Sequence, residues 1–256
     1  MALRIGIAGY GQMGRMIRQK ALAGGHEVPV IVDPDSTSEE VTAEDVASIS
    51  APVDVIIDFT APHEVINNIE RYGELKIPAV IGTTGWYEQM NRVAAIVDKS
   101  GIGLIWSSNF SLGVNLFFQL VKSAGRLMNR FPHYDAAIHE CHHRHKADSP
   151  SGTAKTIGDI ILTALDRKRL TVSELREGRI DKDALHISST RCGSVPGFHR
   201  VIFDSDVDTI VLEHTARNRE GFAEGALAAA DWICGRKGMF SIDDMMESII
   251  GGVFDR

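Results

Sequence analysis

A short glycine-rich segment near the N-terminus constrains the fold more than any other feature. Gly9-Tyr10-Gly11-Gln12-Met13-Gly14 has the pattern G-x-G-x-x-G and lies between an apolar run and an amphipathic one. In this setting the first glycine allows a tight turn, the second lets the backbone approach a pyrophosphate, and the third lets a helix pack on a strand. Free N–H groups at the helix N-terminus then face the phosphates. The segment predicts a dinucleotide site; the alternative is that its glycines serve only a tight turn.

An acidic residue follows at the spacing that such a site requires. Asp33 ends the second apolar run, about 20 residues after the last glycine, where an acid binds the ribose 2′-hydroxyl. A carboxylate at this position repels the 2′-phosphate of NADPH. Position 34 is proline, not an arginine that could pair with that phosphate. We therefore expect NADH to be used at least as well as NADPH.

Residues 1–110 alternate short apolar runs with longer amphipathic ones. The short runs are rich in β-branched residues and end in turn residues, which predicts buried strands at 3–9, 28–33, 54–60, 78–84 and 102–109. The longer runs have helical periodicity, which predicts helices at 13–25, 62–75 and 86–101. Such alternation indicates a parallel sheet with right-handed crossovers.

The pattern changes after Asn109. A long helical run is followed by a run that alternates like a strand, a loop and a second helix, expected at 114–131, 134–144, 146–152 and 153–169. Three strands within 185–216, with no helix between them, then predict an antiparallel or mixed sheet. Residues 217–256 return to helices. We expect an α/β protein, with residues 1–109 and 217–256 as the dinucleotide-binding domain and residues 110–216 as an α+β substrate domain.

The composition excludes several classes of protein. The net charge of −7 argues against nucleic-acid binders and membrane-surface proteins, which usually carry a basic excess. No apolar run approaches the roughly 20 residues of a membrane helix. The three cysteines, Cys141, Cys192 and Cys234, never form C-x-x-C, which is typical of free thiols in a reducing compartment. Because the N-terminus leads directly into a strand, with no room for a signal peptide, we expect a cytoplasmic protein.

Four of the ten histidines lie in the stretch HECHHRHK, residues 139–146. His139, Glu140 and His143 match H-E-x-x-H, which binds zinc when both histidines lie on one face of a helix. The preceding YDAAIHE alternates like a strand, however, and a strand would place His139 and His143 roughly 13 Å apart. The neighbouring cations Arg144 and Lys146 also oppose a dication. We therefore expect no metal site here.

The loop that follows indicates an anion site. Ser151, Gly152 and Thr153 open an amphipathic helix, where a hydroxyl and free N–H groups face an anion along the helix dipole. With His142, His143 and Lys146 beside them, they would form a pocket for carboxylates with proton donors attached. His139 and His145 are explained equally well as ordinary polar residues. The residues predict a small acidic substrate next to a dinucleotide.

These residues resemble the motif E-x-H-H-x-x-K-x-D-x-P-S-G-T-A of the dihydrodipicolinate reductase (4-hydroxy-tetrahydrodipicolinate reductase) family. The motif is present as Glu140-Cys141-His142-His143-Arg144-His145-Lys146-Ala147-Asp148-Ser149-Pro150-Ser151-Gly152-Thr153-Ala154. Further matching segments lie at 82–85, 107–115 and 217–226, so the resemblance covers nearly the whole chain in order.

The resemblance implies a reaction and roles for residues. The family reduces 4-hydroxy-tetrahydrodipicolinate to tetrahydrodipicolinate with NADH or NADPH, in the diaminopimelate route of lysine biosynthesis. His142 would handle a proton, Lys146 would donate one, and His143, Gly152 and Thr153 would hold the substrate carboxylates. The resemblance also implies the fold, a Rossmann domain completed by the C-terminal helices, and a second domain that would assemble a homotetramer. The nicotinamide would lie beside Gly82, Thr83, Thr84, Ser107, Ser108, Asn109 and Phe110, at the carboxyl ends of two strands.

Two departures from the family's pattern concern the cofactor. The glycine loop of many members has one more residue before its last glycine, and some members carry an arginine where this chain has Pro34. Two other functions are the alternatives. One is a related amino-acid dehydrogenase of similar build, against which the S-G-T motif argues. The other is a dinucleotide-sensing regulator, although nothing basic or helix-turn-helix-like accompanies the Rossmann half.

Overall fold

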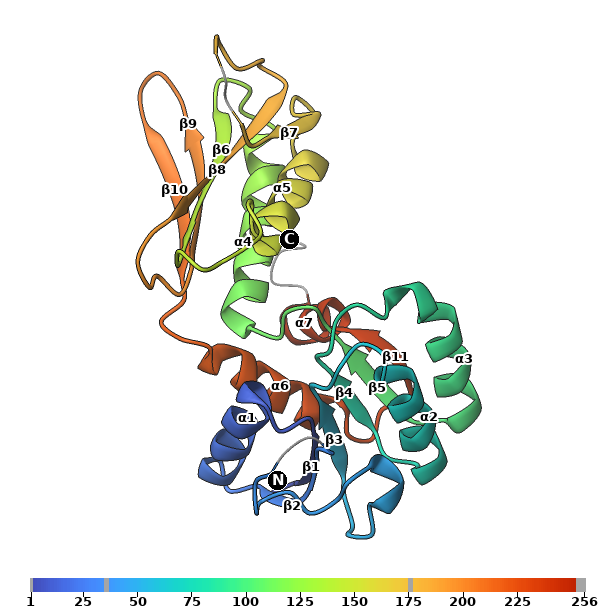
Figure 1. Ribbon diagram of the computed structural model, residues 1–256. Coiled ribbons are helices and arrows are strands. Elements are labelled where there is room, and N and C mark those ends of the chain that lie inside the picture. The colour runs from blue at the N-terminus through green and yellow to red at the C-terminus, as the bar shows by residue number, and fades with distance from the viewer. Residues whose placement is uncertain (1, 35–36, 175–176, 252–256) are drawn as a thin grey trace. The chain divides into compact units, whose positions relative to one another are not determined.

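The chain forms two compact units. The computed structural model describes residues 2–34, 37–174 and 177–251 (Figure 1). One unit comprises the chain up to Leu112 and the chain from Glu220 onward, and the other comprises Gly113–Arg219. The boundaries that we expected, after Asn109 and Ala216, lie slightly earlier in the sequence. The second unit is thus inserted into the first.

The first unit is built on a parallel sheet with the strand order β11-β5-β4-β3-β1-β2. Its strands are β1 Arg4–Ala8, β2 Glu27–Val32, β3 Val55–Asp58, β4 Ala79–Ile81, β5 Gly103–Trp106 and β11 Gly238–Ser241. Its helices are α1 Gln12–Ala23, α2 Val65–Leu75, α3 Met90–Ser100, α6 Glu220–Ile233 and α7 Ile242–Ile250, with short 3₁₀ turns η1 Val46–Ser48 and η2 Tyr87–Gln89. The predicted parallel Rossmann-like sheet is confirmed.

Alternate strand residues face two separate cores. On one face Ile5, Ile7 and Ile57 pack with α1, α6 and α7, and on the other Ile56 and Ile81 pack with α2 and α3. Helix α6 brings small residues, including Ala226 and Ala229, against the first of these faces. Burial on both faces explains why these strands read as continuous apolar runs.

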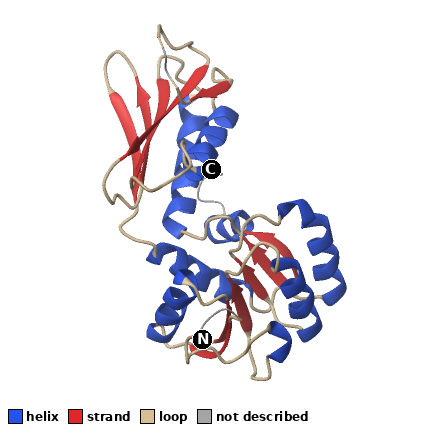
Figure 2. Ribbon diagram, in the orientation of Figure 1, coloured by secondary structure: helices blue, strands red, loops and turns tan. Residues whose placement is uncertain are grey.

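The second unit is a mixed five-stranded sheet with the order β10-β9-β6-β8-β7, as the fold class predicted. Its strands are β6 Asp135–His142, β7 Leu170–Val172, β8 Ala184–Arg191, β9 Phe198–Asp204 and β10 Thr209–Thr215. β6 and β7 pair with β8 in parallel, whereas β9 pairs antiparallel with β6 and β10. The helices α4 Leu112–Met128 and α5 Gly152–Ala164 pack on one face of this sheet (Figure 2).

Two predictions about elements were wrong. The helix expected over 153–169 ends at Ala164, because Leu165 adopts an extended conformation, and the chain then forms the short strand β7 beside β8. The segment 217–256 is not purely helical, since β11 adds a sixth strand next to β5. Both missed strands are short and only partly buried, so neither has the alternation that marks a strand in sequence.

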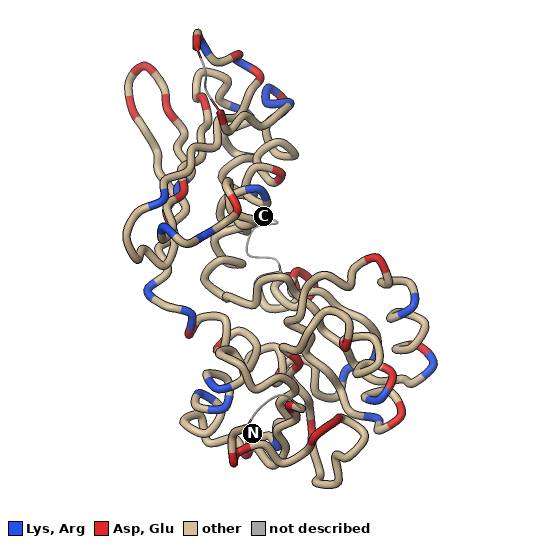
Figure 3. Tube along the Cα trace, viewed as in Figure 1, with Lys and Arg blue, Asp and Glu red and all other residues tan. Residues whose placement is uncertain are grey.

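The surface charge is mixed in both units. Figure 3 shows Lys and Arg interspersed with Asp and Glu along the chain. No helix in the described part of the chain combines the length and apolar character needed to cross a bilayer.

Candidate active site

The glycine loop has the backbone geometry that a dinucleotide site needs. Gly9 has a φ of +86°, and a Cβ there would overlap the Phe59 carbonyl, so only glycine fits this turn. A Cβ at Gly14 would overlap the Gly9 carbonyl oxygen, whereas a Cβ at Gly11 would meet nothing within 4 Å. The first and third glycines are therefore required by packing, and the second leaves open space at the start of α1.

Asp33 is tied to this loop. The Tyr10 N–H donates to Asp33 Oδ2 at 2.6 Å, which joins the end of β2 to the turn after β1. The side chain of Tyr10 is buried, and its hydroxyl donates to Glu40, which also pairs with Arg18 at 2.8 Å. Gln12 and Met13 begin α1 directly after Gly11, whose lack of a side chain leaves the helix without a side-chain cap.

The residues of the predicted nicotinamide site lie at the carboxyl ends of the neighbouring strands β4 and β5. The Ser107 N–H donates to the Ile81 carbonyl at 3.2 Å, which joins the two segments. The Phe59 ring covers Gly82 so closely that a Cβ there would overlap it. Thr83 is buried, and its hydroxyl donates to Asp58 at 3.0 Å. Sequence reasoning missed Asp58, the fully buried end of β3.

The segment after β5 is held by its own polar groups and by α6. The Ser107 hydroxyl donates to the Asn109 carbonyl at 2.8 Å and accepts from the Asn109 N–H at 2.9 Å. Phe110 is buried, and its carbonyl oxygen lies against Gly225 of α6, where a Cβ would overlap it. Ser108 is exposed. The C-terminal segment of the chain thus shapes the loop between β5 and α4.

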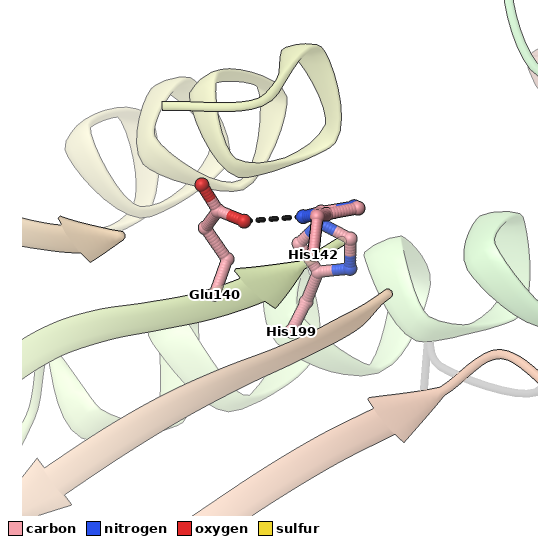
Figure 4. Close-up of side chains that lie close together, drawn as sticks. All are labelled: Glu140, His142 and His199. Atoms are coloured by element: carbon pink, nitrogen blue, oxygen red, sulfur yellow. Dashed lines mark hydrogen bonds and ion pairs between the residues drawn. The ribbon is translucent and has the colours of Figure 1, made fainter. Parts of the chain in front are cut away.

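In the second unit, the end of β6 carries a buried pair of ionisable residues. Residues 136, 138, 140 and 142 alternate inward along β6, so Glu140 and His142 follow Ile138 on the buried face. The Nδ1 atom of His142 hydrogen-bonds to Glu140 Oε2 (Figure 4). Glu140 is 0 % exposed and His142 is 8 % exposed. The strand prediction for this stretch is confirmed, and the zinc-binding helix is ruled out by the same observation.

The Glu140 carboxylate collects donors from two other elements. Arg191 at the end of β8 donates to both oxygens, Nη1 to Oε2 at 3.0 Å and Nη2 to Oε1 at 2.8 Å. The Ser151 N–H donates to Oε1 at 3.3 Å. Burial raises the pKa of Glu140, but the hydrogen bonds from Arg191 and His142 outweigh it and lower the pKa to about 2. The carboxylate is therefore ionised.

His199 from β9 completes this cluster. Its ring lies 5.1 Å from that of His142, nearly perpendicular to it, and its Nε2 lies 3.1 Å from the Ser151 hydroxyl. Burial and the neighbouring His142 lower the pKa of His199 to about 4. Burial also lowers the pKa of His142, although Glu140 opposes that effect. Burial thus disfavours the charged form of both imidazoles.

The loop before α5 brings Lys146 to the helix N-terminus. Ser151 is the N-cap, and its hydroxyl accepts from the Ala154 N–H at 3.2 Å. The Asp148 carboxylate lies between two cationic or donor groups, with Lys146 Nζ at 2.8 Å and the Gly152 N–H at 3.2 Å. A carboxylate of the chain itself thus occupies the position that we predicted for an anion.

The remaining predicted residues are arranged around this loop. His143 follows β6, is half-buried and has its ring 6.3 Å from that of the exposed His145. Thr153 is half-buried in the first turn of α5. His139 faces away from Glu140, on the opposite side of the sheet, and bonds to Thr190 at 3.1 Å. The cluster therefore excludes His139.

Glu140, His142 and His199 also offer ligand atoms within 4.8 Å of one another, a donor set that suits Zn²⁺. Both oxygens of Glu140 are already committed to Arg191, however, so a dication would have to displace a guanidinium. The cluster is better suited to hydrogen bonding than to metal binding.

Comparisons with known proteins agree with this arrangement. Residues 3–110 match the family profile "Dihydrodipicolinate reductase, N-terminus", and residues 113–246 match "Dihydrodipicolinate reductase, C-terminus". The 4-hydroxy-tetrahydrodipicolinate reductase of Christiangramia forsetii is 35% identical over 96% of this chain and 99% of its own. That of Methanoregula boonei is 36% identical over 91% and 92%.

A solved structure shares the fold. The dipicolinate-bound dihydrodipicolinate reductase of Paenisporosarcina sp. TG-14 superimposes with a TM-score of 0.79, at 23% identity, over 96% of this chain and 100% of that one. Both family profiles match in order, and together they span most of the sequence. The chain therefore belongs to the dihydrodipicolinate reductase family.

Proposed function

We propose that this protein catalyses the NAD(P)H-dependent reduction of 4-hydroxy-tetrahydrodipicolinate to tetrahydrodipicolinate, in the diaminopimelate route of lysine biosynthesis. Family membership supports the reaction, and one structural observation carries it. A carboxylate, that of Asp148, lies between Lys146 Nζ and the Gly152 N–H at the N-terminus of α5. This corner of an acidic protein accepts a carboxylate, as a dicarboxylate substrate requires.

The cofactor would be held by the first unit. When bound, it supplies the hydride. The open backbone at Gly11 and the carboxylate of Asp33 fit a pyrophosphate and a ribose, respectively. We assign to cofactor binding Gly9, Tyr10, Gly11, Gln12, Met13, Gly14, Asp33, Gly82, Thr83, Thr84, Ser107, Ser108, Asn109 and Phe110. Because Asp33 is acidic and position 34 is proline, NADH is used at least as well as NADPH.

The second unit would bind the substrate and deliver a proton. The substrate carboxylates are held by side chains and by the N–H groups at the start of α5. The residues that hold them are His143, Ser151, Gly152 and Thr153. His142 or Lys146 supplies the proton that balances the added hydride. The buried His142–Glu140 pair and the half-buried Lys146 are both adjacent to that helix N-terminus.

The second unit would also form the contacts of a homotetramer. Both of its helices pack on one face of its sheet, and the other face carries the half-buried His139, Phe198 and Ile202. The edge strand β10 and the turn before it expose Val207, Ile210 and Val211. Exposed apolar side chains on an open sheet favour assembly with further copies. The three free thiols support a cytoplasmic location.

A steady-state assay with enzymatically generated substrate tests the function. We expect turnover with both cofactors, and a tenfold or larger preference for NADPH would contradict the assignment of Asp33. Replacing His142 and Lys146 together by alanine should abolish most turnover while NADH affinity stays near that of the wild type. Retained turnover would refute the roles of these residues.

A thermal-shift comparison separates the alternatives. NADH with pyridine-2,6-dicarboxylate should stabilise the protein beyond NADH alone, because the diacid binds the folded state. An amino-acid dehydrogenase would turn over an amino acid instead, and a regulator that only senses the dinucleotide need not respond to the diacid.

A further inference from the structure

We propose that Nε2 of His142 is the atom that exchanges a proton with the substrate, and that Glu140 is the positioning residue that selects this atom. The proposal rests on the reductase function proposed above. It adds the identity of the acting nitrogen, the group that fixes it and the reason for a glycine at position 197.

Nδ1 of His142 is already engaged. It bonds to Glu140 Oε2 inside the protein, where the carboxylate is fully buried. An ionised carboxylate can only accept a hydrogen bond, so Nδ1 carries the hydrogen. In neutral His142 the lone pair is therefore on Nε2, and in the imidazolium form the proton that can leave is the one on Nε2.

The Glu140 carboxylate is held firmly in place. Each of its oxygens accepts two hydrogen bonds, which come from His142, Arg191 twice and the Ser151 N–H. Arg191 is itself fixed, because Nη2 donates to the Asp148 carbonyl at 2.7 Å and Nη1 donates to the Thr190 carbonyl at 2.9 Å. The carboxylate thus has a single orientation, set by β6, β8 and the start of α5.

A glycine lies beside Nε2 of His142. Gly197, just before β9, has a φ of +145°, and a Cβ there would come within 2.8 Å of His142 Nε2 and 2.9 Å of Cδ2. A glycine at this position keeps that side of the ring free. Among the described residues, Nε2 of His142 has no hydrogen-bond partner, whereas Nε2 of the neighbouring His199 is engaged by the Ser151 hydroxyl.

The proton balance follows from this geometry. The 4-hydroxyl group of the substrate leaves with a neighbouring ring hydrogen as water, which gives a conjugated imine. The cofactor, when bound, would supply a hydride to one ring carbon of that imine. The electron pair displaced in the substrate takes the Nε2 proton of the His142 imidazolium, which leaves the neutral Nδ1–H form. Solvent then restores the proton. Charged and titratable groups around the ring are Glu140 on β6, Arg191 on β8, His199 on β9 and Lys146 in the loop before α5.

Nitrogen-15 NMR of the wild-type protein tests the tautomer without any substitution. Histidine-labelled protein, with the His142 signals assigned by His142→Gln, should show neutral His142 protonated at Nδ1. Protonation at Nε2 would overturn the proposal. Because this measurement needs no substrate, it separates the proposal from the proposed function: the expected tautomer without any reductase activity would sink the function alone.

Kinetics of Glu140→Gln test the positioning role. We expect kcat to fall roughly 10²-fold, the scale of one general acid, with NADH affinity unchanged. The alkaline limb of the pH profile of kcat, where the imidazolium loses its proton, should move to lower pH, because the carboxylate that favours the imidazolium is lost. Glu213→Gln is the matched control. Like Glu140, Glu213 is paired with an arginine, Arg200, but it lies on β10, outside the cluster around His142. A Glu140→Gln profile identical to that of the control would overturn the proposal.

Discussion

The carboxylate of Asp58 and the hydroxyl of Thr83 lie 3.0 Å apart at the carboxyl edge of the parallel sheet. Asp58 also accepts from the Thr60 N–H at 3.0 Å, the Thr60 hydroxyl at 2.7 Å, the Asn68 amide at 3.1 Å and the Tyr72 hydroxyl at 2.8 Å. Burial and the Asp58 carboxylate raise the pKa of Tyr72 well above its usual value, so the phenol stays a donor. One buried acceptor therefore fixes the loops after β3 and β4.

Asp58→Asn should destabilise the protein, because the N–H groups of the new amide would face the groups that now donate to the Asp58 carboxylate. We expect a loss of about 2 kcal/mol in the free energy of unfolding, together with weaker NADH binding through displacement of Thr83. Urea unfolding and fluorescence titration with NADH measure the two effects. Asp98→Asn, at an exposed position on α3, is the control and should change neither. Unaltered stability in Asp58→Asn would contradict the hydrogen-bonding role.

Gly225→Ala should disturb the loop after β5, although Gly225 lies on α6, far from that loop in the sequence. The new Cβ would overlap the Phe110 carbonyl oxygen, so α6 or the loop must shift, at a cost of roughly 1–3 kcal/mol. NADH affinity should fall as well. Gly221→Ala on the same helix is the matched control, because its nearest neighbour would be the Ser111 hydroxyl at 3.4 Å. Alanine favours helix over glycine by about 1 kcal/mol, so the control should be neutral or stabilised.

Acid should destabilise the second unit in two successive pH ranges. The pKa of His199 is about 4 in the folded chain, whereas an ordinary histidine has a pKa of 6.5, so below pH 6.5 the unfolded chain binds a proton that the folded chain does not. Stability present above pH 6.5 is therefore lost as the pH falls to 4, by about 3 kcal/mol. Protonation of Glu140 causes a further loss of stability at lower pH, between its ordinary pKa of 4.5 and its pKa of about 2 in the folded chain.

Urea unfolding at successive pH values measures this loss. His199→Gln, which has no imidazole to protonate, should show a flatter slope between pH 6.5 and 4. His145→Gln, at an exposed position in the loop after β6, should keep the wild-type slope. Equal slopes in the wild type and His199→Gln would show that burial of His199 does not limit acid stability.

Asp148→Ala should strengthen binding of a diacid. Asp148 occupies Lys146 Nζ and the Gly152 N–H, so a ligand carboxylate must displace it, and Lys146 lowers the pKa of Asp148. An exposed pair of this kind contributes up to about 1 kcal/mol, which corresponds to an approximately fivefold decrease in Kd. Calorimetric titration with pyridine-2,6-dicarboxylate in the presence of NADH measures it. Asp159→Ala, exposed on α5, is the control; weaker diacid binding in Asp148→Ala would make Asp148 part of the binding site instead.

Much of the fold was predictable because its signals are local. The strands β1, β3, β4 and β5 are short apolar runs buried on both faces, and the glycine loop has one backbone solution. β11 was not predictable in this way, since Gly238–Ser241 is only half-buried and its pairing with β5 bridges well over a hundred residues. Pairing over such distances is decided by the assembled sheet and not by the segment itself.

The residues of the candidate site also fall into two groups, those that a local motif reveals and those that only the assembled sheet brings together. His142, Lys146 and the α5 N-terminus are close in sequence, so a motif reveals them together. Arg191 and His199 come from other strands, and only the register of β6 with β8 and β9 brings them to Glu140. One signal was available: His199 shares the inward alternation of Val201 and Phe203, and a polar residue at such a position needs a buried partner.

The insertion of the second unit into the first has a consequence for the order of synthesis. A ribosome releases the first five strands of the parallel sheet, then all of Gly113–Arg219, and only afterwards α6 and β11. Until then β5 has an open edge and one apolar face lacks its alanine-rich cover. A chain stopped anywhere before Glu220 is therefore an incomplete sheet rather than a shorter domain. To obtain the first unit alone, Leu112 must be joined to Glu220, so that its two halves are translated as neighbours.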